Sequence, residues 1–427
     1  MKENQNFDRR NFLKTVGVAG LGTAMAGTTG TLTGCKGKEE QTKNVKPDSK
    51  IEQQKSEFPK VALRKLGKTG VSIPCLSLGT MFNLIDNQII LRSTLKYGVN
   101  YWDTSNVYAG GNSELGIGKY LSKNPEVRKN LFLVSKASRA KTVDEYEERL
   151  QLSLQRMNTD YIDLYYAPHG ASDPAQFTDE LRRWVEKTKK RGLIKFFGFS
   201  THQNMAKCLT AAAKLGWIDA LMTSYNFRLM QNPEMQSAID ACHKANIGIV
   251  AMKTTGKTTL RRFRLDVETQ ADKKLIEQLQ QQGFSQEQAT IKLVLGDERI
   301  SSACVGMESV AVLTANVAAV MNRTELTQTD MDLFKEYAKV TCSGYCSGCA
   351  DICNATLPEI PYISDIMRYL MYYNSYGDKN RARELFAQIP TSVRNKLLDT
   401  DYSAAEEHCP QRMPIAKLVA EAVSKLA

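Results

Sequence analysis

Short apolar segments alternate with longer amphipathic stretches along most of the chain, from about Val61 to Arg323. Buried parallel strands are brief apolar runs, whereas helices repeat their apolar residues every three to four positions. Helical periods of this kind include Val143–Arg156, Asp179–Arg191 and Asn232–Ala245. The intervening apolar runs predict eight strands, at Leu76–Leu78, Tyr101–Trp102, Leu131–Val134, Tyr161–Tyr165, Phe196–Phe199, Ala220–Thr223, Gly248–Met252 and Ser302–Val305.

Eightfold alternation of strand and helix favours the α/β class and a closed (β/α)8 TIM barrel over residues 61–323. Leu63–Ser72, with Gly67 and Gly70 at the turn, predicts a hairpin ahead of the barrel. An open doubly wound sheet is the structural alternative. No Gly-x-Gly-x-x-Gly follows the first strand, which disfavours that alternative.

Residues 1–60 do not follow this alternation of apolar and amphipathic segments. The pair Arg9-Arg10 precedes an apolar run from Val16 to Leu32 whose many glycines are typical of a secretory signal rather than a membrane-spanning helix. Residues 1–35 resemble a twin-arginine signal, with Asp8 where Ser or Thr is usual, and they end in a lipoprotein-like box at Cys35. Residues 36–60 are polar and predict a flexible linker. These patterns imply export to the periplasmic or cell-envelope face, with a lipid anchor to the membrane at Cys35, unless that cysteine follows small residues by chance.

The net charge of +11 falls only to +9 when the two excess positive charges of residues 1–35 are removed. The surplus is spread along the chain rather than gathered in one basic run. Such a distribution indicates a basic surface, and no stacking-aromatic or helix-turn-helix pattern indicates a nucleic-acid partner.

Polar residues follow most of the predicted strands. In barrels of this class the chemistry lies at the carboxyl ends of the strands. The polar segments at these ends are Asp103 to Tyr108, Ser135-Lys136, Pro168-His169, Ser200-Thr201-His202, Ser224 to Asn226, and Met252-Lys253.

This order of residues resembles the aldo/keto reductase family over residues 61–323. The resemblance rests on Asp103-x4-Tyr108, Leu115-Gly116, Ser135-Lys136 and the run Tyr161–Tyr165. It implies an oxidoreductase that interconverts the carbonyl and the alcohol of a small molecule by hydride transfer with a nicotinamide cofactor. Hydride transfer leaves negative charge on oxygen, so a proton donor is needed there.

The resemblance assigns that proton donor to Tyr108. An ammonium such as Lys136 stabilises a phenolate and lowers the pKa of the tyrosine from its usual value near 10, and Asp103 holds the ammonium in place. The family also uses a histidine to orient the substrate carbonyl. Here that histidine is His169, one residue later than the family spacing, since Pro168 stands at the usual position.

The same resemblance implies a cofactor site. Ser200 corresponds to a residue that contacts the nicotinamide amide, and Thr201 stands where the family has a second contact from Asn. Tyr225 corresponds to the ring that stacks on the nicotinamide. Lys253 corresponds to a residue near the phosphates. Gly306 and Glu308 lie in the loop around the adenosine end, followed by Asn316. NADP is the family expectation. NAD is the alternative, because Glu308 would repel a 2′-phosphate but hydrogen-bond a free ribose hydroxyl. If Arg261, Arg262 or Arg264 contacts the 2′-phosphate instead, NADP is again favoured.

Residues 324–427 leave the barrel pattern and carry Cys342, Cys346, Cys349, Cys353 and, later, Cys409-Pro410. Helical stretches lie between them, around Asp365–Tyr373 and Asn380–Gln388. The spacing resembles ferredoxin-type ligation and implies a small α-helical iron–sulfur module with one 4Fe-4S cluster. The favoured ligands are Cys346, Cys349, Cys353 and Cys409, with Cys342 as the substitute. Structural zinc and disulfides are the alternatives.

Two kinds of function remain open at this stage. The first is an exported oxidoreductase whose cluster serves electron transfer with a redox partner or serves structure. The second is a catalytically altered barrel that acts as a ligand- or protein-binding lipoprotein with a structural metal site. His169, Thr201, Glu308 and Ala315 depart from the family pattern and favour this second interpretation.

Overall fold

The computed structural model describes residues 58–256, 266–322 and 325–427. The signal-like segment with Cys35 lies outside these residues, as do the three arginines named above as alternative ligands of a 2′-phosphate. Lys60–Ala427 form one compact unit, and the description below concerns that unit. Among the described residues, no helix is both long and apolar enough to cross a membrane.

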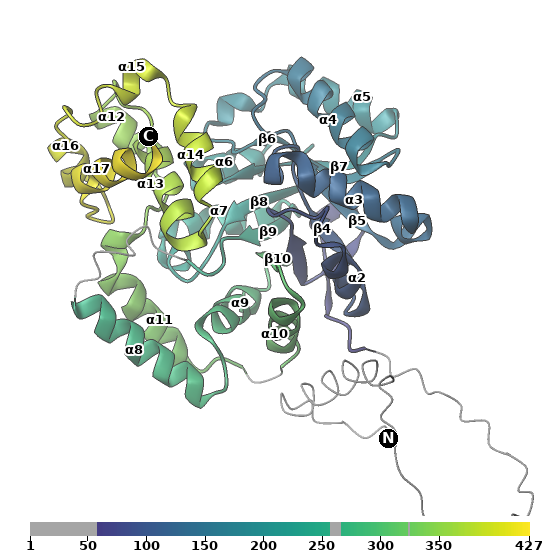
Figure 1. Cartoon of the computed structure of the whole chain (residues 1–427), viewed down its shortest axis with the longest axis horizontal. Coiled ribbons are helices and arrows are strands. Elements are labelled where there is room, and N and C mark those ends of the chain that lie inside the picture. The colour runs from purple at the N-terminus through teal and green to yellow at the C-terminus, as the bar shows by residue number, and fades with distance from the viewer. Residues whose placement is uncertain (1–57, 257–265, 323–324) are drawn as a thin grey trace, which may run out of the picture. The chain divides into compact units, whose positions relative to one another are not determined.

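Eight parallel strands close into a barrel in the order β10-β3-β4-β5-β6-β7-β8-β9, as the sequence predicts (Figure 1). Every predicted strand is present and shifted by no more than a few residues at its ends. The strands are β3 (Leu76–Gly79), β4 (Tyr101–Asp103), β5 (Phe132–Lys136), β6 (Ile162–His169), β7 (Ile194–Thr201), β8 (Ala220–Ser224), β9 (Gly248–Met252) and β10 (Ser302–Gly306).

Helices follow the strands around the barrel, and the three helical periods predicted above correspond to α4, α5 and α7. The helices of this part of the chain are α2 (Gln88–Lys96), α3 (Asn112–Lys123), α4 (Val143–Met157), α5 (Asp179–Lys190), α6 (Met205–Ala212), α7 (Pro233–Lys244), α8 (Asp266–Gln281), α9 (Gln286–Gly296), α10 (Val310–Met321) and α11 (Gln328–Val340). Helix α4 begins at a capping box, in which Thr142 and Glu145 bond each other's backbone.

The predicted hairpin is confirmed as β1 (Leu63–Lys65) and β2 (Ser72–Pro74), paired antiparallel. Leu66 at its turn is fully buried in the cluster of apolar side chains that fills the barrel. The hairpin lies against Gly248, the first residue of β9. It therefore covers the amino end of the strands and leaves the opposite end for the polar residues.

The alternation of side chains along the strands decides which polar residues face the interior. Phe132 and Val134 belong to the apolar cluster inside the barrel, so Lys136 extends the same face at the end of β5. Tyr101 lies in the same cluster and places Asp103 on that face at the end of β4. The period of two thus puts a carboxylate and an ammonium directly above the apolar filling.

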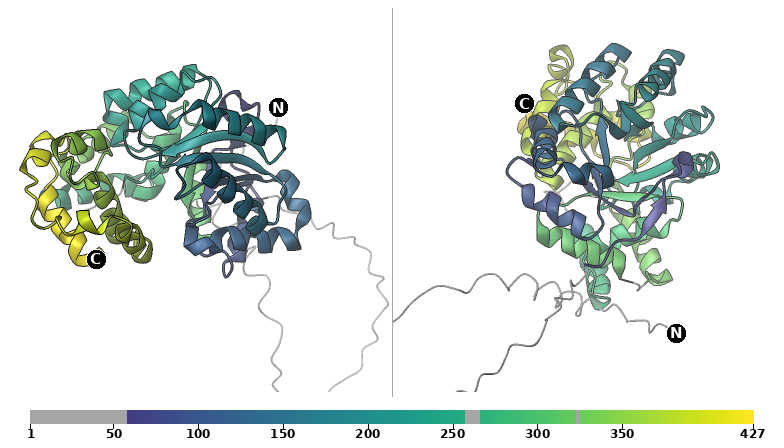
Figure 2. Two further views of the ribbon diagram at one scale, coloured as in Figure 1. Left: turned by 90° about the horizontal axis from the view of Figure 1, so that it is seen from above. Right: turned by 90° about the vertical axis from the view of Figure 1, so that its right-hand side faces the viewer.

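A second group of helices follows α11 and has an apolar core of its own. These helices are α12 (Ala350–Thr356), α13 (Ile363–Met371), η7 (Tyr372–Tyr376), α14 (Lys379–Ala387), α15 (Thr391–Arg394), α16 (Ser403–His408) and α17 (Ile415–Leu426). The two predicted C-terminal helices correspond to α13 and α14. We call residues 342–427, which contain α12–α17, the C-terminal helical region; Figure 2 shows it gathered at one side of the barrel.

The C-terminal helical region contacts the carboxyl ends of β7 and β8. The amide of Asn204 donates to the carbonyl of Gly348 over 2.6 Å, and Lys207 pairs with Asp351 at 2.9 Å. The side-chain amide of Asn226 donates to the hydroxyl of Tyr345 over 3.0 Å. These contacts hold the C-terminal helical region over the end of the barrel where the polar residues gather.

Candidate active site

Asp103, Tyr108 and Lys136 meet at the carboxyl end of β4 and β5. The Lys136 ammonium, 1% exposed, donates to a carboxylate oxygen of Asp103 and, over 2.8 Å, to the carbonyl of Thr104. Its Nζ lies 4.8 Å from the ring centroid of Tyr108. The second oxygen of Asp103 is buried and has no hydrogen-bond partner among the described residues. The sequence-predicted trio is therefore assembled as one contact network.

Asp103 and Lys136 are buried and Tyr108 is partly buried, so burial and their mutual electrostatic interactions set their protonation states. Burial is the largest single influence and lowers the pKa of Lys136, but the charges of Asp103 and Tyr108 and the hydrogen bond to Asp103 together outweigh it, so the net direction is upward and the ammonium stays charged. Burial raises the pKa of Tyr108, and Lys136 opposes that rise without cancelling it. Lys136 lowers the pKa of Tyr108, as expected. Desolvation raises it by more, so the expectation of a net lowering is wrong. Tyr108 is accordingly a phenol, a proton donor, at neutral pH.

His169 lies beside Tyr108 despite its displaced position in the sequence. The pairing of β6 with β7 is irregular between Tyr166 and His169, and the Ala167–Pro168 peptide bond is cis. The ring centroids of His169 and Tyr108 are 6.4 Å apart, and His169 Nδ1 bonds the hydroxyl of Ser138. The extra residue is absorbed in the strand irregularity, so the histidine reaches the phenol.

Burial, followed by the charge of Lys136, lowers the pKa of His169 well below its usual value. The imidazole is therefore neutral, with one N–H to donate. A neutral donor beside a phenol is suited to orienting a carbonyl oxygen without adding a charge.

His202 was not assigned a role from the sequence, although it directly follows Thr201 at the end of β7. Its ring centroid is 6.4 Å from that of His169. Its Nδ1 is buried and has no hydrogen-bond partner among the described residues. Burial lowers its pKa well below the usual value, as for His169. The only signal in the sequence is its position at a strand end.

Two expected contacts of a nicotinamide lie at the end of β7. Ser200 is fully buried, and its hydroxyl accepts from the amide of Gly170 over 3.2 Å. The hydroxyl of Thr201 donates to the carbonyl of Ala171 over 2.6 Å and points away from the barrel interior. Thr201 thus fixes the loop after β6, and Ser200 is the one of the two on the interior face.

Tyr225 does not occupy the position expected for stacking on a nicotinamide. Its side chain is fully buried, and its hydroxyl donates to Asp297 over 2.6 Å and accepts from Gln236 over 2.9 Å. The reason is the period of the strand: Ser224 faces the interior, so Tyr225 faces the helices outside. The assignment of Tyr225 to the cofactor is therefore corrected, and Ser224 is the β8 residue that faces the interior.

The remaining expected cofactor residues lie along the ends of β9 and β10. Gly306 and Glu308 are exposed, and the carbonyl of Glu308 accepts from Asn87 over 2.7 Å. Asn316 is buried on α10. Lys253 follows β9 with φ of 55°, and its Nζ lies 5.1 Å from the ring centroid of Tyr372. Lys253 therefore already contacts the C-terminal helical region.

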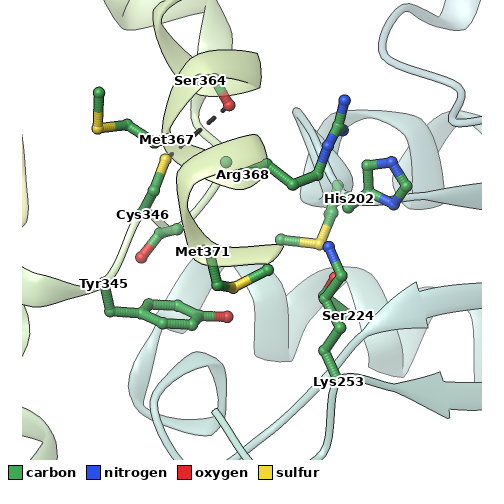
Figure 3. Close-up of a pocket in the computed structure, with 12 residues that line it drawn as sticks. His202, Ser224, Lys253, Tyr345, Cys346, Ser364, Met367, Arg368 and Met371 are labelled. Atoms are coloured by element: carbon green, nitrogen blue, oxygen red, sulfur yellow. Dashed lines mark hydrogen bonds between the residues drawn. The ribbon is translucent and has the colours of Figure 1, made fainter. Parts of the chain in front are cut away.

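A hollow lies between the strand ends and the C-terminal helical region (Figure 3). We call it the interface hollow. His202, Ser224 and Lys253 reach it from the barrel, whereas Tyr345, Cys346 and Arg368 reach it from the other side. Sequence reasoning did not predict that residues beyond position 340 would complete this site, because no strand-end rule applies to them.

Four of the five C-terminal cysteines surround a second hollow, which we call the cysteine hollow. Its lining includes Cys346, Cys349, Cys353 and Cys409 but not Cys342. Burial raises the pKa of Cys349 and of Cys353 to about 12, and the neighbouring thiols add to this. No disulfide joins these cysteines, all of which are free thiols. The favoured set of four is thus brought together, and Cys342 stands apart.

No group of three or more His, Cys, Asp or Glu side chains in the described part of the chain is arranged to hold a single metal ion. Four thiolates on one zinc ion lie about 3.8 Å apart, given a zinc–sulfur distance of about 2.3 Å and a tetrahedral angle. The four cysteines of the cysteine hollow do not show this arrangement in the described part of the chain.

Comparisons with known proteins locate the barrel among enzymes. A profile described as the aldo/keto reductase family matches residues 76–339. "Aldo-keto reductase yakc [NADP(+)]" of Schizosaccharomyces pombe is 27% identical over 216 residues, which cover 46% of this chain and 62% of that protein. "L-galactose dehydrogenase" of Arabidopsis thaliana is 24% identical over 298 residues, 64% of this chain and 91% of that protein.

One solved structure shows the same fold. The "aldo-keto reductase AKR11C1 from Bacillus halodurans (holo form)" superimposes with a TM-score of 0.55 at 21% identity, over 65% of this chain and 96% of that one. The profile match ends at residue 339, so it includes α11 almost to its end, beyond the expected barrel boundary at residue 323. The residues from 340 onward, with all five C-terminal cysteines, lie outside it.

Proposed function

This chain belongs to the aldo/keto reductase family, and we propose that it is a nicotinamide-dependent oxidoreductase that interconverts the carbonyl and the alcohol of a small molecule. The observation that carries the proposal is the contact network of Asp103, Lys136 and Tyr108 with neutral His169 beside it. A family likeness fixes the fold but not the chemistry. The contact network adds a neutral phenol as proton donor, a charged ammonium to stabilise the phenolate, and a neutral imidazole to orient the carbonyl.

The residues of this chain perform the acid–base part of the reaction. In the reducing direction Tyr108 donates its proton to the carbonyl oxygen, and Lys136 stabilises the phenolate that remains. Asp103 keeps Lys136 charged and in place. His169 donates its N–H to the same oxygen and orients the carbonyl. A reduced nicotinamide, when bound, supplies the hydride.

Ser200, Ser224 and Lys253 are the residues we assign to holding that cofactor. The fit is supported by the interface hollow, which already presents a serine hydroxyl, an ammonium and the unpartnered Nδ1 of His202. The name of the Schizosaccharomyces pombe relative supports NADP. Exposed Glu308 favours NAD, since a carboxylate repels a 2′-phosphate, and the ratio of kcat/KM for NADPH and NADH decides between the two cofactors.

Replacing Tyr108 by Phe tests the proposed function. The variant keeps the ring that contacts Lys136 but lacks the proton, so we expect the turnover number for aldehyde reduction to fall by about 100-fold or more. Cofactor affinity, measured by fluorescence titration with NADPH, should stay the same. A Tyr108→Phe variant with unchanged turnover would contradict the mechanism. A wild-type protein that binds NADPH and ligand but never turns over would support the alternative of a binding lipoprotein.

We also propose that Cys346, Cys349, Cys353 and Cys409 ligate one 4Fe-4S cluster. The support is the cysteine hollow, the free thiols and the absence of Cys342 from the lining. Cys409→Ser should remove most of the iron from anaerobically purified protein, whereas Cys342→Ser should leave iron, sulfide and the visible spectrum intact. Equal loss in both variants would contradict this ligand set, and a full complement of zinc would contradict the cluster.

Export and a lipid anchor at Cys35 complete the proposal, and their support is the sequence pattern of residues 1–35 alone. Replacing Arg9-Arg10 by two lysines should retain the protein in the cytoplasm. Cys35→Ala should release the exported protein from the membrane fraction into the soluble one. Unchanged fractionation of both variants would contradict this location.

A further inference from the structure

Positive side chains gather around Tyr108 from two parts of the chain. Arg381, on α14, places its Cζ 5.2 Å from the ring centroid of Tyr108. Arg368, on α13, lines the interface hollow together with Lys253 (Figure 3). The proposed mechanism uses neither arginine, so the contact of Arg381 with the proton donor requires another explanation.

The acidic groups nearby pair with other residues and leave Arg381 and Lys253 without an ion pair among the described residues. Arg368 pairs with Asp365 on its own helix. Asp378 accepts from the backbone amide of Arg381 over 3.3 Å and so caps α14. Asp103 is occupied by Lys136. In the described part of the chain, neither Arg381 nor Lys253 forms an ion pair with a carboxylate.

Arg381 also carries a donor without an acceptor. Its Nε is buried and has no hydrogen-bond partner among the described residues. An N–H taken out of water without a partner is costly, and more so when the group is charged. A ligand oxygen placed against this edge of the guanidinium would remove that cost.

The pKa shifts of His169 and Tyr372 also indicate a positive potential at this site. Burial, and after it the positive charges of Lys136, Arg381, Arg368 and Lys253, lowers the pKa of His169. Burial alone raises the pKa of Tyr372, yet Lys253, Arg368 and Arg381 bring it below its ordinary value. The site therefore has a positive potential before any ligand binds.

Arg368 and Arg381 differ in what else they serve. Arg368 lines the interface hollow together with Cys346 and pairs with Asp365. Arg381 lies against Tyr108 and has no ion-pair partner among the described residues, so of the two arginines it is the one in contact with the proton donor.

We propose that the substrate carries an oxyanion group in addition to its carbonyl or alcohol, and that Arg381 binds this group beside Tyr108. The inference rests on the proposed oxidoreductase function and adds the class of its substrate. A guanidinium presents paired N–H donors that match a carboxylate or a phosphate. The C-terminal helical region thereby determines specificity for chemistry that the barrel performs.

A matched pair of aldehydes tests the proposal in the full-length enzyme. 4-Formylbenzoate and 4-formylbenzamide have nearly the same shape and differ in charge. With NADPH, we expect kcat/KM to favour the benzoate by about 10- to 100-fold, the usual range for one hydrogen-bonded charge. Arg381→Met should abolish this preference, and Arg381→Lys should retain part of it. The ratio of the two substrates cancels any effect of Arg381 on the pKa of Tyr108.

Arg383→Met is the control, because Arg383 lies two residues further along α14, is exposed, and contacts Tyr373 and Lys425 instead. It should keep the full preference. Equal kcat/KM for the two aldehydes in the wild type, or a preference that survives in Arg381→Met, would overturn the inference while leaving the oxidoreductase function intact.

A third aldehyde, 4-formylphenyl phosphate, distinguishes the two kinds of oxyanion. Preference for it over the benzoate assigns the site to a phosphate ester, and the reverse assigns it to a carboxylate. If no aldehyde is reduced, the proposed function has failed. Isothermal titration with 4-formylbenzoate then decides the inference by itself: weaker binding to Arg381→Met than to Arg383→Met supports it, and equal binding overturns it.

Discussion

His169 and His202 combine a position at strand ends with pKa values well below those of free histidine, for which burial is the main cause. Both imidazoles therefore fold in their neutral form. The unfolded chain, in contrast, takes up two protons as the pH falls through about 6.5. Because the unfolded state binds more protons than the folded state, the free energy of unfolding decreases as the pH falls below that value.

We predict that this decrease reaches at most about 1.4 kcal/mol per pH unit for each histidine. Urea denaturation between pH 7.5 and pH 5.5 measures it. A His169→Gln/His202→Gln variant should show a flatter dependence than the wild type. His408→Gln, at an exposed position on α16, should leave the slope unchanged. An identical slope in all three proteins would show that neither strand-end histidine is buried in its neutral form.

Individual residues were predictable from the sequence where a strand fixed their direction. Asp103 and Lys136 follow apolar strands, and the period of two carries them into the interior. The same period was not applied to Tyr225, which the resemblance assigned to the cofactor and which faces outward instead. No such rule predicts the place of Arg381, because it depends on how α14 packs near Tyr108, 273 residues earlier in the chain.

At the scale of elements, the join between the barrel and the C-terminal helical region depends on one glycine. Gly348 has φ of +78°, and a Cβ at this position would lie 2.3 Å from the carbonyl oxygen of His202. Its own carbonyl accepts from the amide of Asn204. Any side chain here must push the cysteine-bearing segment away from the end of β7.

We predict that Gly348→Ala lowers stability by more than the ~1–2 kcal/mol expected for a positive φ alone and exposes the amide of Asn204 to hydrogen exchange. The matched control is Gly377→Ala. Gly377 has a similar φ of +75°, but no atom lies within 4 Å of the point that a Cβ would occupy there. Chemical denaturation and hydrogen exchange of both variants measure the difference. Equal effects would mean that only backbone strain is involved and that the contact with His202 does not matter.

The elements themselves were largely predictable, and their boundaries shifted by only a few residues. Strands such as Gly248–Met252 have uniformly apolar residues because both of their faces are covered. The helices α13 and α14 were recognisable from their own period. The docking of the C-terminal helical region on the barrel was not predictable, because the residues that meet there are polar, as the contacts of Asn204 with Asp351 and of Asn226 with Tyr345 show.

At the scale of the whole molecule, residues 60–427 form one compact unit although the family profile ends at residue 339. Buried Arg228, at the end of β8, donates to the carbonyl of Thr341 over 3.2 Å. The cation is thus held by the segment that leads into the cysteines. Separating the two parts would leave it without this partner.

We therefore predict a single cooperative thermal transition for protein purified with the proposed cluster bound. The calorimetric enthalpy should equal the van't Hoff enthalpy. Two resolved transitions, with the visible spectrum lost in the first, would show that the C-terminal helical region unfolds independently. Removing the metal with a chelator before heating is the control, since it should lower the midpoint without altering the barrel's helix and strand content at low temperature.

The position of Arg381 in the chain also imposes an order of events during synthesis. The last strand of the barrel ends at Gly306, and Arg381 follows 75 residues later. At about 5–20 residues per second, a ribosome needs roughly 4–15 s to make that stretch. The last strand of the barrel is therefore made several seconds before the side chain that lies against Tyr108 exists. The contact between Arg381 and Tyr108 is thus added to a barrel whose strands are already complete in sequence.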